Sequence, residues 1–270
     1  MIIVGEKLNG SIPSVARAIA DRDEEKLRAL AVKQDEAGAD YLDVCASVPE
    51  DVEEETLKWM LEIVQEESDL PICLDSPSPD TIVKAMKYVK KPGLINSVSM
   101  EGDKIAKVFP AIADTHWKCV ALCSDEKGIP DTAEKRLKVF DRILAEADKY
   151  GISHDRLFID PLVEMVCTSE DGIETVIETI KGIRERDEDV HIIGAISNIS
   201  FNLPARALMN QTFTTLAINA GMDAGILDPT NRGMLGAIFA TEACLGMDDF
   251  CMEYIGAFRE GRIGPLPKNK

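Results

Sequence analysis

The sequence predicts a single-domain α/β protein, a (β/α)8 (TIM) barrel in which eight parallel strands are each followed by a helix. Short β-rich runs alternate through the chain with longer segments whose apolar residues recur at helical spacing. The length of 270 residues, of which 45% are hydrophobic and 29% charged, is close to that of one such barrel. We therefore expect one domain over residues 1–270.

The expected strands are eight short runs rich in β-branched and aliphatic residues: Ile2–Val4, Tyr41–Cys45, Pro71–Asp75, Gly93–Val98, Trp117–Cys123, Leu157–Asp160, His191–Ile196 and Ala224–Leu227. Between them the clearest helices are expected at Asp23–Ala37, Glu53–Glu66, Thr132–Tyr150 and Gly172–Arg184. This alternation implies right-handed crossovers and a parallel sheet, and eight units close into a barrel. An open doubly wound sheet is the alternative, but no Gly-x-Gly-x-x-Gly follows the first strand and no Gly-x-x-x-x-Gly-Lys-Ser/Thr occurs.

Charge and composition exclude several classes of partner. The chain has 48 acidic and 30 basic residues, and its net charge of -18 would repel nucleic acid and anionic membrane surfaces. No apolar run approaches the roughly 20 residues that span a bilayer, and the first residues lack the features of a secretory leader. Seven cysteines, an odd number, indicate reduced thiols. We expect a cytoplasmic protein that binds neither nucleic acid nor membrane.

Carboxylates and amides lie at, or just after, the ends of seven of the eight expected strands: Asn9, Asp43, Asp75, Asn96, Asp160, Asn198 and Asp228. In a barrel this is the end at which sites are built. Asp75 shares side-chain parity with Cys73, and Asn96 with Leu94, so these residues can face the barrel axis together. Such a group suits a ligand rich in donors, for example the pyrimidine half of a pterin, whose ring N–H and amine one carboxylate can accept. The alternative is that each residue only caps the following helix.

Six segments carry these polar residues: VGEKLN (4–9), DYLDV (40–44), LDSPSPD (74–80), LINSVS (94–99), IDPLV (159–163) and GAISNISFNLP (194–204). Together they resemble, in order and spacing, the pterin-binding methyltransferases that act on methyltetrahydrofolate and a corrinoid protein. That family is related more distantly to the dihydropteroate synthases. Any one of the segments alone would be a weak signal, and the combination is specific.

The resemblance implies that Asp75, Asn96 and Asp160 hold the pterin ring. Asn9 and Asp43 are expected to contribute to the same binding site because they lie at the same end of the barrel. Asn198 corresponds to the amide that reaches pterin N5, and Ser197 lies beside it. Arg206 is expected to meet the glutamate carboxylates of the folate. In one departure, the chain has Phe201 where relatives of the acetogenic type have a Gln three residues after the Asn.

The implied activity is transfer of a methyl group between N5 of tetrahydrofolate and the cobalt of a corrinoid (cobalamin) carried by a separate protein, in either direction, by a homodimeric enzyme. This in-line displacement needs alignment and management of charge at N5 but no nucleophilic side chain. Asn198 is the expected catalytic residue, because an amide can offer a donor or an acceptor. Two alternatives stay open. One is a dihydropteroate synthase-like enzyme, which needs a basic cluster that GAISNISFN does not offer; the other is a non-catalytic folate-binding subunit.

Three weaker patterns are interpreted as structural. Asp189, His191 and Gly194 match the D-x-H-x-x-G pattern of cobalamin-binding domains, but this His begins an apolar strand instead of lying in a loop. The cysteines lack usual zinc-ligand spacing, so they are expected to be packing thiols and no metal site is predicted. His116 and His154 are expected to be structural or solvated.

Overall fold

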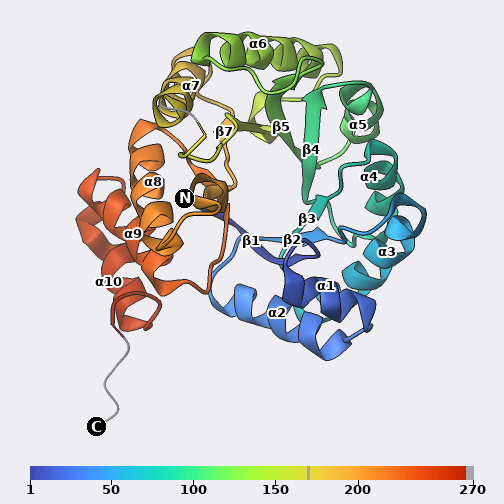
Figure 1. Cartoon of the computed structure of the whole chain (residues 1–270), viewed down its shortest axis with the longest axis horizontal. Coiled ribbons are helices and arrows are strands. Elements are labelled where there is room, and N and C mark those ends of the chain that lie inside the picture. The colour runs from blue at the N-terminus through green and yellow to red at the C-terminus, as the bar shows by residue number, and fades with distance from the viewer. Residues whose placement is uncertain (169–170, 266–270) are drawn as a thin grey trace.

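The computed structural model describes residues 1–168 and 171–265, and its eight parallel strands form a barrel surrounded by helices (Figure 1). The strands are β1 (Ile2–Asn9), β2 (Tyr41–Cys45), β3 (Ile72–Asp75), β4 (Leu94–Met100), β5 (Lys118–Asp125), β6 (Leu157–Asp160), β7 (His191–Ile192) and β8 (Ala224–Leu227). Their order is β7-β6-β5-β4-β3-β2-β1-β8. β7 and β8 stand at the two ends of this order, and the chain just after β7 meets β8 where the backbone N–H of Ile226 donates to the carbonyl of Gly194 at 2.9 Å. The predicted (β/α)8 fold is confirmed.

The helices follow the strands in the expected alternation: α1 (Pro13–Ala20), α2 (Glu24–Glu36), α3 (Glu50–Glu67), α4 (Pro79–Ala85), α5 (Lys104–Ile112), α6 (Ala133–Lys149), α7 (Gly172–Arg186), α8 (Arg206–Ala220), α9 (Arg232–Cys244) and α10 (Met252–Arg259). Four 3₁₀ helices join them: η1 (Met86–Tyr88), η2 (His154–Arg156), η3 (Ile196–Ser200) and η4 (Asp249–Cys251). Within the described ranges, none of these helices combines the length and apolarity that crossing a bilayer requires.

The buried apolar residues form two layers, as a packed barrel requires. The inner layer fills the barrel and consists of Val4, Cys73, Leu94, Val120, Phe158, Ile193, Ala224 and Ile226. The larger layer lies between the strands and the helices and includes Leu42, Leu61, Ile95 and Phe140. Cys73 and Leu94 belong to the inner layer, so the strand parity on which the prediction for Asp75 and Asn96 depended is confirmed.

The first strand differs from the prediction, which ended it at Val4. β1 continues to Asn9 and contains a β-bulge. Gly5 pairs with Leu42 and Leu8 pairs with Val44, so two residues of β1 lie opposite one residue of β2. Buried Gln34 of α2 fills this bulge: its Oε1 accepts the backbone N–H of Lys7 at 2.9 Å. A Cβ on Gly5 would stand 2.5 Å from the same oxygen, so the bulge requires glycine there.

The seventh strand is shorter than predicted. Regular pairing ends at Ile192 instead of Ile196, and Ile196–Ser200 form the 3₁₀ helix η3. At Gly194 the chain passes so close to its neighbours that a Cβ would stand 2.8 Å from Cγ2 of Val163. Apolar composition alone predicted a strand through this segment, whereas local hydrogen bonds, such as that from the backbone N–H of Asn198 to the carbonyl of Ala195 at 3.1 Å, fold it into η3.

Candidate active site

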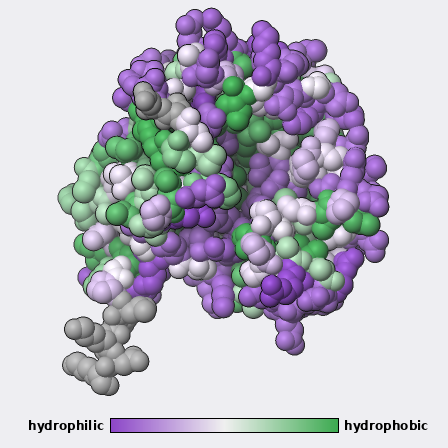
Figure 2. Space-filling model, viewed as in Figure 1, coloured by the Kyte–Doolittle hydropathy of each residue, from purple (hydrophilic) through white to green (hydrophobic). Residues whose placement is uncertain are grey.

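A cavity of 670 Å³ opens at the carboxyl ends of the strands. Seven of the eight predicted site residues line it: Asn9, Asp43, Asp75, Asn96, Ser197, Asn198 and Arg206. Figure 2 shows a hollow at the centre of the viewed face, with hydrophilic side chains around it. A volume of this size is in the range of small-molecule and cofactor sites, so the cavity is the candidate active site.

Strand register places the polar residues of the first four strands in two levels. Asn9, Cys45, Asp75 and Asn96 are register partners from one strand to the next and form the upper level. Asp43 lies one level deeper, opposite Cys73, with 1% of its surface exposed. The Nδ2 of Asn96 donates to Oδ1 of Asp43 at 3.3 Å, so the two levels are joined by a hydrogen bond.

Burial raises the pKa values of Asp43 and Asp75 and so disfavours their ionisation. Loss of water raises the pKa of Asp43 to about 6, against the opposing effect of hydrogen bonds from Cys73, Asn96 and Asn9. The pKa of Asp75 is also raised well above its usual value, first by burial and then by the nearby charge of Asp43. Ionising both of these adjacent buried carboxyl groups is therefore costly in free energy, and hydrogen-bond donors from a ligand would lower that cost.

The wall formed by η3 is tied to β1 and α8. Oγ of Ser197 donates to Oε2 of Glu6 at 3.2 Å, and Nη2 of Arg206 donates to the carbonyl of Ser197 at 2.8 Å. Nε of Arg206 also donates to Oγ of Ser200 at 3.1 Å. Asn198 is thus held on a short helix whose flanking residues are hydrogen bonded on both sides, which fixes the backbone from which its amide projects.

Glu6 and Lys7 are site residues that sequence reasoning missed. Both line the cavity, although neighbours in a regular strand point to opposite faces. The bulge after Gly5 explains this, because an extra residue re-aims the side chains next to it. Burial raises the pKa of Glu6, and the charge of Lys7 opposes that rise. Lys7 forms an ion pair with Asp228 at 2.9 Å, which adds Asp228 to the cavity wall.

Asp160 is the one predicted site residue that does not line the cavity. It ends β6 two residues after inward-facing Phe158, and 8% of its surface is exposed. Its Oδ1 accepts the backbone N–H of Leu162 at 2.7 Å. Burial raises its pKa to about 6, against the opposing effects of the Leu162 N–H and of Arg136. The parity of Asp160 is as predicted, but it lies among side chains below the surface that the cavity reaches.

The helix-capping alternative for the strand-end residues is wrong. The N-cap positions of the helices that follow strands are Ile12, Pro49, Ser78, Asp103, Thr132, Asp171, Ala205 and Asn231. None of the seven strand-end residues is among these described caps. Ser78, for example, accepts the backbone N–H of Thr81 at 3.3 Å and leaves Asp75 free of that role.

A second cavity of 330 Å³ adjoins the first and is lined by Val163, Glu164, Met165, Thr168, Asn198 and Phe201. Asn198 and Phe201 line both cavities. The Phe201 side chain is 52% exposed, and the guanidinium of Arg206 lies 5.7 Å from its ring centre. Phe201 therefore presents an apolar surface, where a Gln would present an amide, at the junction of the two cavities.

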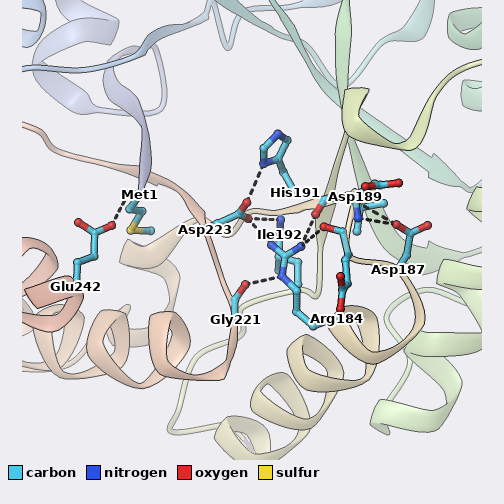
Figure 3. Close-up of polar contacts among 11 residues, drawn as sticks. Met1, Arg184, Asp187, Asp189, His191, Ile192, Gly221, Asp223 and Glu242 are labelled. Carbon is cyan, nitrogen blue, oxygen red and sulfur yellow. Dashed lines mark hydrogen bonds and ion pairs between the residues drawn. The ribbon is translucent and has the colours of Figure 1, made fainter. Parts of the chain in front are cut away.

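The D-x-H-x-x-G histidine lies at the opposite end of the barrel. Figure 3 shows His191 pointing to Asp223, whose Oδ2 is 2.8 Å from its Nδ1, with Arg184 on the other side of the carboxylate at 2.8 Å. His191 begins β7 and Asp223 immediately precedes β8, so both lie at the amino ends of the strands. The active sites of such barrels lie at the opposite, carboxyl end of the strands, so we interpret this cluster as a structural link between α7, β7 and β8.

The prediction of packing thiols is confirmed for four cysteines and wrong for three. Cys45, Cys73, Cys119 and Cys123 are buried, whereas Cys167, Cys244 and Cys251 are exposed.

The two other histidines have the structural or solvated positions expected for them. His154 lies in η2, 2.5 Å from Asp187 and 3.2 Å from Asp148, and His116 is exposed.

Comparison with known proteins identifies several relatives. Residues 5–228 match a family described as pterin binding enzyme. A methylcorrinoid:tetrahydrofolate methyltransferase of Eubacterium limosum is 48% identical over 268 residues, which are 98% of this chain and 99% of that protein. A methionine synthase of Mycobacterium tuberculosis is 30% identical over 251 residues, 86% of this chain. The matched part is 21% of the length of that larger protein.

Solved structures show the same fold. A dihydropteroate synthase from Stenotrophomonas maltophilia with active site-bound imidazole superimposes with a TM-score of 0.67 at 16% identity, over 92% of this chain and 93% of that chain. One from Xanthomonas albilineans in complex with 7,8-dihydropteroate gives a TM-score of 0.63 at 19% identity, over 90% and 92%. At these identities the similarity supports the architecture alone.

Proposed function

The chain belongs to the pterin-binding enzymes, and we propose that it is a methyltransferase that moves a methyl group from a protein-bound methylcorrinoid to N5 of tetrahydrofolate. The observation that carries the proposal is one cavity at the carboxyl ends of the strands, lined by Asp75, Asn96 and Asn198, in a chain 48% identical to a methylcorrinoid:tetrahydrofolate methyltransferase over its whole length. The reversible chemistry also allows methyltetrahydrofolate to methylate the corrinoid.

The pterin would be held by the acid and amide cluster of β1–β4. Its ring N–H and exocyclic amine form a two-pronged donor edge, which the carboxylate of Asp75 can accept, and Asn96 can bond the adjoining ring atoms. The donor edge supplies what the buried pair Asp43 and Asp75 lacks, because each charge-assisted bond favours the ionised carboxylate by about 1.5–3 kcal/mol. We propose that Asp160 completes this cluster once the pterin enters, as the family resemblance implies.

The reaction is a displacement at the methyl carbon. The lone pair of N5 forms the new N–CH₃ bond, the bond from cobalt to carbon breaks with its electron pair left on cobalt, and N5 then loses its proton to water. Asn198 is the proposed catalytic residue: its amide oxygen can accept a hydrogen bond from N5–H while positive charge develops there, and its NH₂ can donate a hydrogen bond to the neutral N5 of methyltetrahydrofolate. Glu6 acts as a positioning residue, because it holds Ser197 beside Asn198.

The electrostatics of the cavity disfavour a dihydropteroate synthase-like reaction. That chemistry releases pyrophosphate and needs cations free to bind it. Among the residues that line this cavity, the cations are Lys7, which is paired with Asp228, and Arg206, which donates to Ser197 and Ser200. The acids Glu6, Asp43, Asp75 and Asp228 outnumber them. One guanidinium that already donates to η3 carries too little free positive charge for pyrophosphate, and we propose instead that its remaining N–H donors meet the glutamate carboxylates of tetrahydrofolate.

The corrinoid is a substrate brought by a partner protein. The relative that is 48% identical over 98% of this chain is named for methylcorrinoid and tetrahydrofolate, which supports a corrinoid partner. We further propose a cytoplasmic homodimer that works in one-carbon metabolism. All seven cysteines are free, which supports a reducing compartment.

The test is an anaerobic reaction of the pure protein with tetrahydrofolate and methylcob(III)alamin, followed by the visible spectrum. Loss of the methyl-cobalt band with appearance of cob(I)alamin is the expected result, and added methyltetrahydrofolate should reverse it. The Asn198→Ala variant is the matched control. Folate binding measured by calorimetry without any transfer, even with the cognate corrinoid protein, would favour a non-catalytic folate-binding subunit. Absence of both binding and transfer would refute the proposal.

A further inference from the structure

Arg136 is the largest side chain among the fully buried residues that the structure describes. Only 1% of its surface is exposed. Arginine is almost never fully buried unless it is paired, because a guanidinium loses its hydration on leaving water. Arg136 belongs to the first turn of α6, the helix that follows β5 (Figure 1), so it lies toward the end of the barrel at which the active-site cavity opens.

The hydrogen bonds of Arg136 join two neighbouring connections at the barrel mouth. Its Nε donates at 2.9 Å to the carbonyl of Pro130, which lies between β5 and α6. Its Nη1 donates to the carbonyls of Pro161 and Leu162, both at 2.7 Å, and its Nη2 donates to Oε2 of Glu164. Connections that follow strands build the active sites of such barrels, so the buried guanidinium fixes part of the site's frame.

The backbone that Arg136 holds is strained directly after Asp160. Leu162 has a φ of 70°, in the left-handed region that a residue with a Cβ rarely adopts. Both of its backbone polar groups are bonded to charged side chains, because its carbonyl accepts from Arg136 and its N–H donates to Oδ1 of Asp160 at 2.7 Å. Without the guanidinium, Leu162 could relax to an ordinary conformation, and the bond that orients the Asp160 carboxylate would be lost.

The other end of this segment has an anchor of its own. Residues 163–165 line the second cavity together with Asn198. The backbone N–H of Val166 donates to the carbonyl of Ile199 in η3 at 3.0 Å. This bond does not involve Arg136, so loss of the guanidinium should release the backbone beside Asp160 and leave η3, which carries Asn198, in place.

The charge of Arg136 also favours an ionised Asp160. Burial raises the pKa of Asp160, and the positive charge of Arg136 opposes that rise. The N–H groups of Arg136 are directed to the carbonyls and to Glu164. The Leu162 bond uses Oδ1 of Asp160, so Oδ2 can accept a hydrogen bond from a ligand.

We propose that Arg136 is a positioning residue for the pterin: it fixes the segment after β6 so that the carboxylate of Asp160 meets the ring. The assignment rests on the proposed function, because it gives Asp160 a pterin to bind. It adds a residue outside the cavity lining to those that decide folate affinity. The competing interpretation is that Arg136 only stabilises the barrel.

Arg156 provides a matched comparison for that interpretation. Its side chain is also partly buried, and its guanidinium also donates to three backbone carbonyls, those of Ile112, Ala113 and Trp117. Arg156 ends η2, immediately before β6, and therefore lies at the amino ends of the strands. Loss of either guanidinium should lower stability, but only Arg136 lies at the end of the barrel that holds the cavity.

The test compares Arg136→Lys with Arg156→Lys by calorimetry of tetrahydrofolate binding and by turnover in the methylcobalamin assay. Lysine keeps the charge but cannot reproduce the planar fork of N–H donors. Arg136→Lys should raise the Kd of tetrahydrofolate about 10-fold and change turnover at saturating tetrahydrofolate by less than about three-fold. Arg156→Lys should leave that Kd within about two-fold of the wild-type value, although urea titrations show both variants to be less stable.

A double-mutant cycle tests whether Arg136 acts through Asp160. In the Asp160→Asn background, Arg136→Lys should raise the Kd further by less than about two-fold, because the carboxylate that it positions is absent. If Arg136→Lys does not fold, Glu164→Ala replaces it. The Glu164 side chain is 42% exposed, and its removal takes away the acceptor of Nη2, which should raise the Kd about three-fold.

The outcomes separate this assignment from the proposed function. An unchanged Kd in Arg136→Lys, an equal rise in Arg156→Lys, or fully additive losses in the double-mutant cycle would overturn the positioning role while the wild type still binds tetrahydrofolate. An unchanged Kd in Glu164→Ala would overturn it where that variant is used. Failure of the wild type to bind tetrahydrofolate would instead refute the proposed function, and the assignment with it.

Discussion

Replacing Asp160 by Asn should stabilise the unliganded protein while weakening its hold on the pterin. The carboxyl group lies at the end of β6 with 8% of its surface exposed. Its Oδ1 accepts the backbone N–H of Leu162 at 2.7 Å, and an asparagine Oδ1 can accept the same bond. The substitution therefore removes a buried ionisable group without removing its observed hydrogen bond.

The magnitude follows from the raised pKa. In the unfolded chain Asp160 loses its proton near its ordinary pKa of 3.8, whereas burial holds the folded pKa at about 6. The folded state binds the proton more tightly, so stability falls as the pH rises from 3.8 to about 6 and stays constant above that. A difference of about two pKa units corresponds to about 3 kcal/mol. Asp160→Asn removes this cost, which is fully present at pH 8.

The assay is urea denaturation at pH 8, with calorimetry of tetrahydrofolate binding alongside. The variant should unfold with a free energy about 3 kcal/mol higher, and its gain should shrink as the pH falls below 6. Folate affinity should drop, because the Nδ2 of asparagine replaces the carboxylate oxygen that does not bond Leu162, and an NH₂ group cannot accept a hydrogen bond from the pterin. Asp155→Asn, a change at an exposed aspartate, should alter stability by less than about 0.5 kcal/mol. Unchanged or lower stability of Asp160→Asn at pH 8 would refute the reasoning.

Three further substitutions probe the same end of the barrel. Asn198→Ala should lower turnover roughly 10²-fold in the methylcobalamin assay with modest change in folate affinity, and unchanged turnover would remove Asn198 from the mechanism. Burial raises the pKa of Glu6, so wild-type turnover should decline as the pH falls and Glu6 takes up a proton. In Glu6→Gln this acidic decline of turnover should disappear. If the decline persists in the variant, Glu6 does not take part in the reaction. Arg136→Met should lower the free energy of unfolding by about 3 kcal/mol in urea titrations. Arg136 is 1% exposed, and its guanidinium donates to three backbone carbonyls and to Glu164. A loss of less than about 0.5 kcal/mol would contradict this prediction.

The architecture was predictable because parallel strands buried on both faces produce continuous apolar runs. β2, β6 and β8 were predicted to the residue. For β6 and β8 the apolar run is followed at once by a turn-forming residue, Pro161 and Asp228 respectively. β7 was overpredicted for the same reason, because the apolar run through Ile196 continues into η3 after the strand has ended. Composition shows that a segment is buried, and it does not show which backbone conformation buries it.

The site was predictable where strand parity holds and missed where a bulge breaks it. Asp75 and Asn96 follow inward-facing residues on regular strands, and both line the cavity. Glu6 and Lys7 face the cavity together only because β1 carries an extra residue beside buried Gln34 of α2. That contact joins positions 27 residues apart, and periodicity within one strand contains no information about it.

Buried carboxyl groups with raised pKa values favour a pterin over ligands that lack paired N–H donors. A carboxylate already paired with a lysine or arginine would gain little from a donor edge. Asp75 is buried beside Asp43 and accepts a hydrogen bond from the thiol of Cys45, while Asp43 accepts hydrogen bonds from Cys73, Asn96 and Asn9. The nearest cations are occupied elsewhere: Lys7 with Asp228 and Arg206 with η3. A ligand with paired N–H donors therefore offsets the cost of ionising these buried acids, and a ligand without such donors does not gain that affinity.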